Sequence, residues 1–391
     1  MTERTGAKVE EARRLAPRFA ARAAGHDRAG LFPAEDFADL RRSGMFGLMV
    51  PERLGGAGAG FADYAAVAYE LARGNGATAL IFNMHASVTG ALGGVTNELA
   101  EALGLPPEAL EARDRCLRAA AEGSWYAVAM SERGSGSRLS QMTTSYEQND
   151  DGFHIKGAKT FCSGAGHADA YLVAARSVTE PDKVSQFLVP PGPGLTVEQT
   201  WDALGMRATG SHDLHIDVTV PTSALLGGVE GLALVVAQLA PHWMVASYAA
   251  VYVGVARAAV DAAVEHVTDR KLGHLPAVRA RIGRADAAVA AAHLTVMEAA
   301  RRVDEAPGDA ETNRWVWRAK LVAGTTAAEV AASMLEAAGT SAMRRGHPLE
   351  RLYRDARAGS LQPATSDVCA DWLGVEALGG DPDSQGSAPR W

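Results

Sequence analysis

The sequence predicts a mainly α-helical protein with a β domain in its middle, and three observations lead to this prediction. Apolar residues recur three and four positions apart in the first third of the chain, alternate in short runs in the middle, and return to the helical spacing after Gly231. Helices and strands that are segregated in this way argue against a doubly wound sheet. No G-x-G-x-x-G motif opens a helix after a strand, so a nicotinamide site is not supported.

The first segment is predicted to be helical from about residue 8 to residue 118. Its clearest helical stretches are the Ala-rich runs Tyr64–Arg73 and Thr78–Leu92, and a glycine-rich turn at 51–58 interrupts the pattern. We therefore expect an N-terminal α-helical domain over residues 1–122.

In the middle segment, short runs of alternating apolar residues are bounded by Gly, Asp and Asn. Phe153–Gly157 and Tyr171–Ala175 are examples, and such runs are typical of strands. The sequence predicts a β domain over residues 123–228.

After this domain the helical spacing continues through three long stretches. These are residues 232–267, 276–303 and 311–335, and their apolar faces are long enough to pack as a bundle. We place a C-terminal helical bundle at 229–378. The remaining residues, 379–391, are rich in Gly, Asp, Ser and Pro and are predicted to form a flexible tail.

Composition narrows the class of protein. The net charge of the 391 residues is -8 and no basic run is present, which argues against nucleic acid as a partner. The three cysteines form no C-x-x-C pair, so we predict neither a disulfide framework nor a metal site, and a reducing cytoplasm fits. The N-terminus has no apolar signal core. The longest apolar run, 232–255, is broken by Gln238, Pro241 and His242 and is predicted to be a buried helix rather than a membrane span.

Four motifs, in matching order, resemble those of the acyl-CoA dehydrogenase family. Met130–Ser137 is similar to the family's T-E-P-x-x-G-S-D segment, and Gly157–Ala165 is similar to its G-x-K-x-[WF]-I-[TS]-N-[AG] strand. Gly205–Ser211 matches the G-x-R-x-[ST]-x-[ST] turn, and Arg351–Asp367 resembles the signature helix and loop. The resemblance covers nearly the whole chain. It implies an N-terminal α-helical domain, a small middle β-barrel domain and a C-terminal four-helix bundle, in a homotetramer or homodimer.

By this resemblance the cofactor is FAD, bound between the β domain and the bundle. A flavin is held by hydrogen bonds and packing that tune its ring, while the ring performs the redox step. The implied contacts of the ring are Met130, Ser131, Gly136, Ser137, Phe161, Cys162 and Ser163. The implied contacts of the nucleotide half are Arg270, which in the family reaches a neighbouring subunit, together with Gly339, Thr365 and Asp367.

The position of the catalytic base departs from the family pattern. Where most members carry the glutamate that removes a substrate α-proton, this sequence has Pro363, whose side chain cannot accept a proton. Other members place the glutamate on the first bundle helix, where this sequence has Met244. His85 and His242 lie near these places and are candidate bases, because a neutral imidazole accepts protons near pH 7. A lone histidine on an Ala-rich helix is more often a hydrogen-bonded core residue.

Three functions compete on this evidence. The favoured one is FAD-dependent α,β-dehydrogenation of a specialised acyl thioester, carried by CoA or an acyl carrier protein, with a non-standard base. The alternative is a two-component monooxygenase or oxidase that receives reduced flavin, uses oxygen, and handles protons with His85. The third is a non-catalytic paralogue, which the joint retention of Ser131, Phe161 and Ser163 argues against. The sequence does not name the electron acceptor or the flavin reductase.

Overall fold

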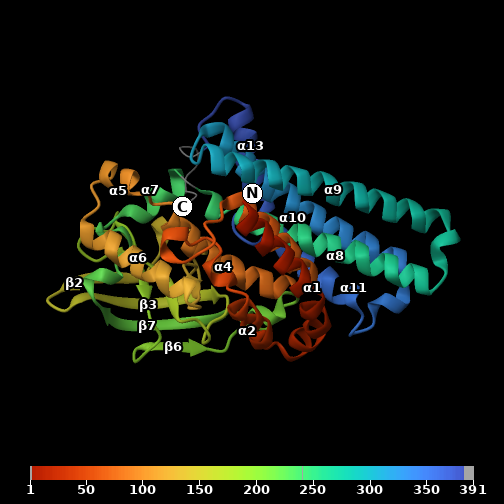
Figure 1. The fold of residues 1–391 in the computed structure, drawn as a ribbon, viewed down its shortest axis with the longest axis horizontal. Coiled ribbons are helices and arrows are strands. Elements are labelled where there is room, and N and C mark those ends of the chain that lie inside the picture. The colour runs from red at the N-terminus through yellow and green to blue at the C-terminus, as the bar shows by residue number, and fades with distance from the viewer. Residues whose placement is uncertain (1, 240, 383–391) are drawn as a thin grey trace.

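The computed structural model describes residues 2–239 and 241–382, and it places helices, then strands, then helices along the chain. The predicted fold class, mainly helical with a β domain in the middle, is confirmed. Figure 1 shows the sheet on one side and the long bundle helices on the other. Most of the tail predicted to be flexible, residues 383–391, lies outside the described residues.

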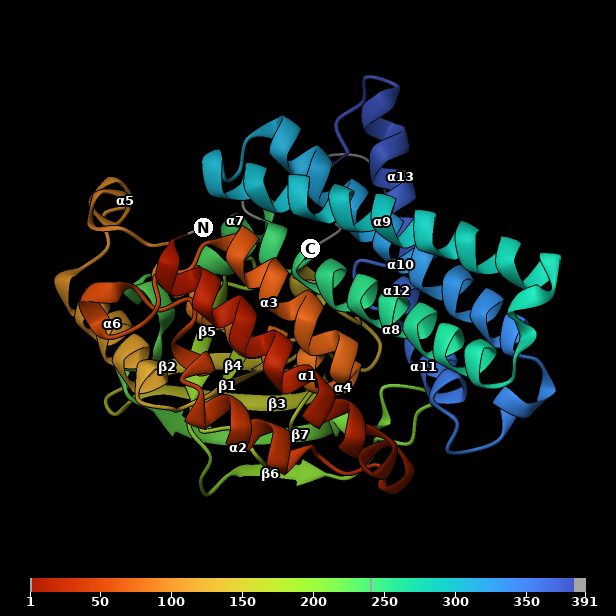
Figure 2. The ribbon, with the colours of Figure 1, turned by 45° about the vertical axis from the view of Figure 1, so that its right-hand side comes forward.

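Of the N-terminal helices, α3 (Phe61–Gly74) and α4 (Gly76–Gly93) lie between the sheet and the bundle, whereas α5 (Asn97–Ala102) and α6 (Pro107–Ala121) lie on the side away from the bundle (Figures 1 and 2). Helix α4 is buried along nearly its whole length, and Asn75 begins it by accepting a hydrogen bond from the Ala77 N–H at 3.2 Å. The helices are α1 (Glu3–Ala29), α2 (Ala34–Arg42), α3 (Phe61–Gly74), α4 (Gly76–Gly93), α5 (Asn97–Ala102) and α6 (Pro107–Ala121). The predicted turn at 51–58 holds a short 3-10 helix, Glu52–Leu54.

The middle segment forms one curled sheet in the order β1-β4-β2-β3-β7-β6, with β5 paired to β4. The strands are β1 (Tyr126–Ala129), β2 (Ser145–Asn149), β3 (Gly152–Cys162), β4 (Ala170–Ser177), β5 (Val184–Val189), β6 (Leu195–Glu198) and β7 (His212–Val220). The antiparallel pair β3–β7 loses its register between Lys159 and Cys162. Such a bulge re-aims side chains at the end of a strand.

The C-terminal segment is built around three long helices, α8, α9 and α10, and the shorter α11 packs against α8 and α10. The full set is α7 (Leu232–Leu239), α8 (Ser247–Asp269), α9 (Pro276–Glu305), α10 (Ala310–Ala338), α11 (Pro348–Ala356), α12 (Ala358–Leu361) and α13 (Ser366–Ala377). The stretch expected to be helical over 232–267 is not continuous, because a 3-10 turn at Pro241–Trp243 precedes α8. Proline has no backbone N–H to donate to the preceding turn, so the helix is interrupted there.

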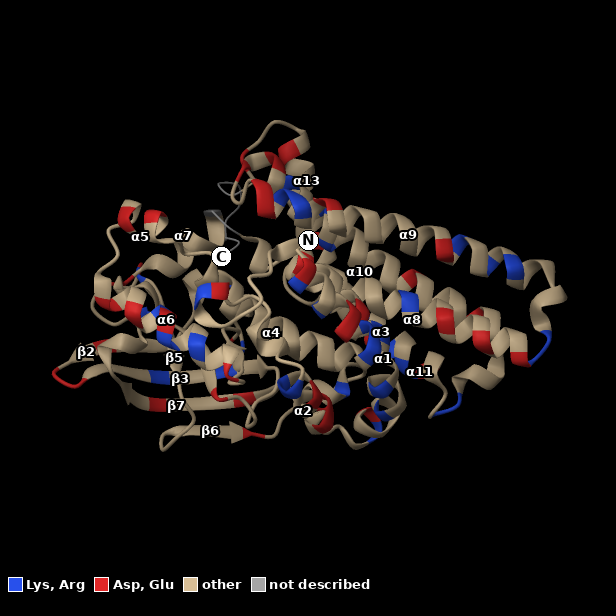
Figure 3. Cartoon of the chain, in the orientation of Figure 1, with Lys and Arg blue, Asp and Glu red and all other residues tan. Residues whose placement is uncertain are grey.

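The apolar segment Pro241–Asp269 is long enough to cross a membrane, but 78% of its most apolar window is buried inside the protein. It is therefore a core helix, as the sequence predicted. Charged residues of both signs are interspersed along the outer faces of α8 and α9 (Figure 3). The negative net charge is spread over the molecule in this way.

Helix α11 joins the three parts of the chain. Its Asp355 accepts a hydrogen bond from the Met206 N–H at 2.6 Å, and its Arg354 binds the Asp27 carboxylate of α1 at 2.6 Å. Gly205 lies so close to α11 that an added Cβ would be 2.2 Å from the Arg354 carbonyl oxygen. These contacts fix the middle segment and α1 against α11 of the bundle.

Candidate flavin site

The most unusual feature of the sheet is Phe161, at the bulge near the end of β3. Its φ is 57°, in the left-handed region that bulky residues rarely adopt, and 62% of the residue is exposed. Its ring meets that of Trp201 edge to face, with centroids 6.0 Å apart. A strained, exposed aromatic residue at a strand bulge needs a reason, and a flat ring stacked against it supplies one.

The turn that carries Met130 and Ser131 lies directly against this strand end. The Thr160 N–H donates to the Ser131 carbonyl at 2.8 Å, so Ser131 and Phe161 are brought close together. Within the turn, Glu132 and Gly136 exchange two backbone hydrogen bonds of 2.9 Å, and Gly136 has a φ of 63°. Ser137 follows in the same turn. The structure therefore gathers the predicted ring contacts of both motifs at one edge of the sheet.

A buried ion pair locks this turn. The Lys159 Nζ donates to Glu132 Oε1 at 2.8 Å and to the Met130 carbonyl at 3.2 Å, and both charged side chains are almost fully buried. Burial opposes ionisation of Glu132, but the Lys159 ammonium and hydrogen bonds from Thr143 lower its pKa to about 2. Glu132 is thus a carboxylate at neutral pH. The pair was missed as a site element, although both residues stand in the motifs that carry the resemblance.

Behind Phe161, a chain of hydroxyl groups orients Ser163. The Ser163 and Ser211 hydroxyl oxygens are 2.9 Å apart, those of Ser211 and Thr209 are 2.7 Å apart, and Thr209 donates to the Met206 carbonyl at 2.9 Å. Cys162 is fully buried, and burial raises the pKa of its thiol to about 12. Its thiol is therefore unreactive, which leaves its backbone as the part that could contact a flavin.

The residues predicted for the nucleotide half fall into two places. Thr365 caps α13 by accepting from the Val368 N–H at 3.3 Å, and Asp367 lies in the first turn of that helix. Arg270 is exposed at the C-terminal end of α8, and Gly339 ends α10. Helix α10 rises about 28 Å between Lys320, which touches the loop before Thr365, and Gly339. One chain does not bring the two places together.

His85 does not have a free nitrogen. Its Nε2 donates to the Phe46 carbonyl at 2.8 Å, and its Nδ1 accepts from the Tyr126 N–H at 3.1 Å. Burial lowers its pKa to about 4, so the imidazole is neutral and held in one tautomer. In this arrangement His85 joins α4 to two other segments and has no lone pair for a substrate proton.

His242 lies in different surroundings, at the 3-10 turn before α8. It is buried, its Nδ1 has no hydrogen-bond partner among the described residues, and burial lowers its pKa to about 4. The Phe61 ring meets it edge to face at 5.3 Å, and Trp243 is beside it. The wall next to Met244 is therefore aromatic and uncharged.

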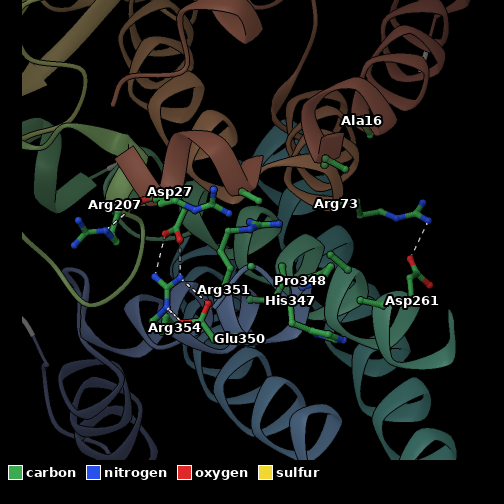
Figure 4. A pocket seen from close by; sticks show the side chains of 18 of the residues that line it. Ala16, Asp27, Arg73, Arg207, Asp261, His347, Pro348, Glu350, Arg351 and Arg354 are labelled. Carbon is green, nitrogen blue, oxygen red and sulfur yellow. Dashed lines mark hydrogen bonds and ion pairs between the residues drawn. The ribbon is translucent and has the colours of Figure 1, made fainter. Parts of the chain in front are cut away.

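A separate cavity of about 960 Å³ lies between α1, α8 and α11 (Figure 4). Its ends are charged, with Arg354 paired to Asp27 at one end and Arg73 paired to Asp261 at the other. None of the predicted flavin or catalytic residues lines it. This cavity is not the candidate flavin site.

The geometry predicts the effect of removing the exposed ring. We expect Phe161→Ala to weaken flavin binding about 2- to 10-fold, because an aromatic contact of this kind contributes about 0.5–1.5 kcal/mol. Flavin fluorescence titration measures this change. Leu204→Ala is the control, since Leu204 is equally exposed on the neighbouring loop but lines the separate cavity. Equal affinities for the Phe161→Ala variant and the unchanged protein would remove Phe161 from the site.

Models of three domains of one family match the chain in succession. They are the acyl-CoA dehydrogenase N-terminal domain at residues 2–107, the middle domain at 127–219 and the C-terminal domain at 246–366. The chain therefore belongs to the acyl-CoA dehydrogenase family, and it is a flavin-dependent enzyme.

Two curated relatives span nearly the whole chain. The putative acyl-CoA dehydrogenase YdbM of Bacillus subtilis is 29% identical, with 95% of this chain and 96% of the relative covered. The L-evernosamine nitrososynthase of a Micromonospora species is 32% identical, with 94% and 89% covered.

Two solved structures share the fold. KijD3, in complex with FMN and a dTDP-linked 3-amino-4-keto sugar, has a TM-score of 0.87 and 27% identity, with 98% of this chain and 96% of that chain covered. The dibenzothiophene monooxygenase TdsC of a Paenibacillus species has a TM-score of 0.81 and 25% identity, with 95% and 97% covered. The family uses FAD and a structural neighbour binds FMN, which agrees with the exposed ring and polar turn described above.

Proposed function

We propose that the protein is a flavin-dependent monooxygenase that receives reduced flavin, uses molecular oxygen, and oxygenates an amine nitrogen of a small molecule. The observation that carries this proposal is the loop 359–364, which comprises the end of α12 and the turn that follows it. It bears Pro363 where α,β-dehydrogenation needs a base, and no residue from Gly359 to Ala364 has an ionisable side chain.

The neighbouring candidates for a displaced base support the same conclusion. Gln362 is held by the Tyr252 hydroxyl, which donates to its Oε1 at 2.6 Å. His85 has both nitrogens occupied, and Met244 has no proton-accepting group. His242 has a pKa of about 4, which makes it a weak base. These four residues therefore do not provide an effective base for a reaction that begins by abstracting an α-proton.

Oxygenation makes a different demand on the protein. The bound flavin supplies the oxygen chemistry, and the chain must hold the ring, orient the substrate and exclude water. Phe161 and the Ser131 turn suit the first task, and the aromatic wall of Phe61 and Trp243 suits the others. The relatives named nitrososynthase and the neighbour named monooxygenase support an oxygenase, and the amino-sugar complex of KijD3 supports an amine substrate.

We also propose that the working enzyme is a homodimer or homotetramer. Arg270 and Gly339 lie at the far end of the bundle from the loop that precedes Thr365, so one flavin can meet both sets only if two subunits contribute. Arg270 is exposed and its guanidinium is suited to phosphate oxygens.

The second candidate is dehydrogenation of an acyl thioester, the function that the sequence favoured. It is supported by the likeness to YdbM and by His242, whose Nδ1 has no hydrogen-bond partner within the described residues 2–239 and 241–382, whereas both nitrogens of His85 are used. This candidate requires His242 to accept a proton despite its low pKa.

One experiment separates the two functions. The protein is mixed aerobically with reduced FMN or FAD from a separate reductase, isotope-labelled oxygen and a panel of small amines. We expect labelled oxygen in an amine product. In a parallel anaerobic experiment, oxidised flavin on the protein is mixed with acyl-CoA thioesters, and we expect no bleaching. Bleaching by an acyl thioester, without any labelled product in the aerobic arm, would establish the dehydrogenase instead.

A further inference from the structure

Lys320 lies on α10 with its side chain completely buried beneath the loop that carries Pro363. Its ammonium donates to the carbonyl oxygens of Gly359 at 2.8 Å, Gln362 at 3.1 Å and Ala364 at 2.8 Å. An ammonium has three N–H donors, and each of them has one carbonyl here. The three acceptors surround Pro363 in the sequence, so one side chain fixes the backbone on both sides of that position.

The protonation state of Lys320 allows all three hydrogen bonds at once. Burial lowers the pKa of Lys320 to about 8, which still leaves it largely protonated at neutral pH. A buried ammonium is costly unless polar partners replace its water, and three carbonyl dipoles do so here. If this position served packing alone, an apolar residue would fill it without the free-energy cost of burying a charge.

The loop is also held from its other sides. An added Cβ on Gly324, one turn after Lys320, would lie 2.6 Å from the Gly359 carbonyl oxygen, and one on Gly359 would lie 2.8 Å from the Tyr252 ring. The Tyr252 hydroxyl holds the Gln362 side chain. Contacts from α8 and α10 therefore set the loop in one position, and Lys320 supplies most of its backbone hydrogen bonds to those helices.

We propose that Lys320 is a positioning residue of the active site, which clamps the loop 359–364 through three carbonyl oxygens so that Pro363 faces the substrate in a fixed place. This inference rests on the proposed function, because the loop is assigned to the substrate side of the flavin by its place in the family's signature segment. Lys320 touches neither flavin nor substrate in this account. It acts through the loop.

The first test measures the loop without any flavin. In Lys320→Met, hydrogen exchange of the Gln362 amide, which donates to the Ala358 carbonyl at 2.9 Å, is expected to speed up about 10-fold or more. Amides in the middle of α9 should keep their protection, which shows that the variant is folded. Lys156→Met is the matched control, because Lys156 is exposed on β3 and pairs with Asp217. A folded Lys320→Met protein with unchanged exchange in this loop would overturn the proposal.

A second variant keeps the test decisive if Lys320→Met does not fold. Gly324→Ala leaves the ammonium in place and raises the helix propensity of α10, but its Cβ pushes Gly359 away from Lys320. It is expected to loosen the same loop while α10 stays protected. Unchanged loop exchange in Gly324→Ala would count against the clamp.

The second test measures turnover with separately supplied reduced flavin. Lys320→Met is expected to lower kcat about 10-fold or more and to leave the affinity for flavin within about 2-fold, because a misplaced loop affects orientation rather than ring binding. A loosened loop with unchanged kcat would overturn the positioning role. If the unaltered protein has no such turnover, the proposed function fails, while the exchange measurement still decides whether Lys320 holds the loop.

Discussion

Replacing Glu132 by Gln is expected to lower the free energy of unfolding by about 3–5 kcal/mol, the usual cost of removing one partner of a buried ion pair. The substitution leaves the Lys159 ammonium buried beside a neutral amide and weakens the acceptor of the Thr143 and Thr144 N–H groups. Urea unfolding at pH 7 measures the loss. Glu305→Gln, which alters an exposed pair with Arg301, is the control and should cost less than about 1 kcal/mol.

The same ion pair predicts a dependence on pH. The pKa of Glu132 is about 2 in the folded protein and about 4.5 when unfolded, so the unfolded chain binds the proton more readily. Its contribution to stability is therefore complete above pH 4.5 and is lost as the pH falls towards 2. Glu132→Gln should lack this part of the acid sensitivity. An unchanged acid profile in the variant would contradict the role given to the pair.

Replacing His85 by Leu is expected to cost about 2–5 kcal/mol of stability, because it leaves the Phe46 carbonyl and the Tyr126 N–H buried without partners. Between about pH 6.5 and 4 the unfolded state binds a proton at His85 that the folded state does not, so stability falls as the pH falls through that window. The variant should lose this dependence. His215→Leu is the control, since that imidazole is exposed and pairs with Glu198.

The result separates two roles of His85. If His85 is a catalytic base, its replacement by Leu should lower turnover by about 10²- to 10⁴-fold with little change in stability. If His85 instead links α4 to the other segments, its replacement should lower the free energy of unfolding, and any loss of turnover would follow from the displacement of α4. A fully stable but inactive His85→Leu protein would restore His85 as a base.

The sequence was sufficient where the information is local. Apolar spacing predicted α3, α4, α9 and α10, but it also predicted one helical stretch over 232–267, which the 3-10 turn at Pro241–Trp243 interrupts. The flavin motifs could be predicted because their residues follow one another along short segments. Phe161 is predicted as a ring contact in this way, although its left-handed backbone and its exposure became visible only in the structure.

What the sequence did not reveal depends on contacts between distant segments. The two hydrogen-bond partners of His85 come from segments about 40 residues away on either side, so its spacing on an Ala-rich helix could not show that both nitrogens are used. Lys320 has the same property, since its three carbonyls follow it by about 40 residues. Burial, which sets the low pKa of His242, is likewise a property of the fold.

The most direct test of the central claim compares the affinity of the protein for oxidised and reduced flavin. We propose an enzyme that is supplied with reduced flavin, so FADH₂ or FMNH₂ should bind at least about 10-fold more tightly than the oxidised form, and the purified protein should be nearly colourless. A yellow protein that keeps stoichiometric FAD and is bleached anaerobically by an acyl thioester would contradict the account.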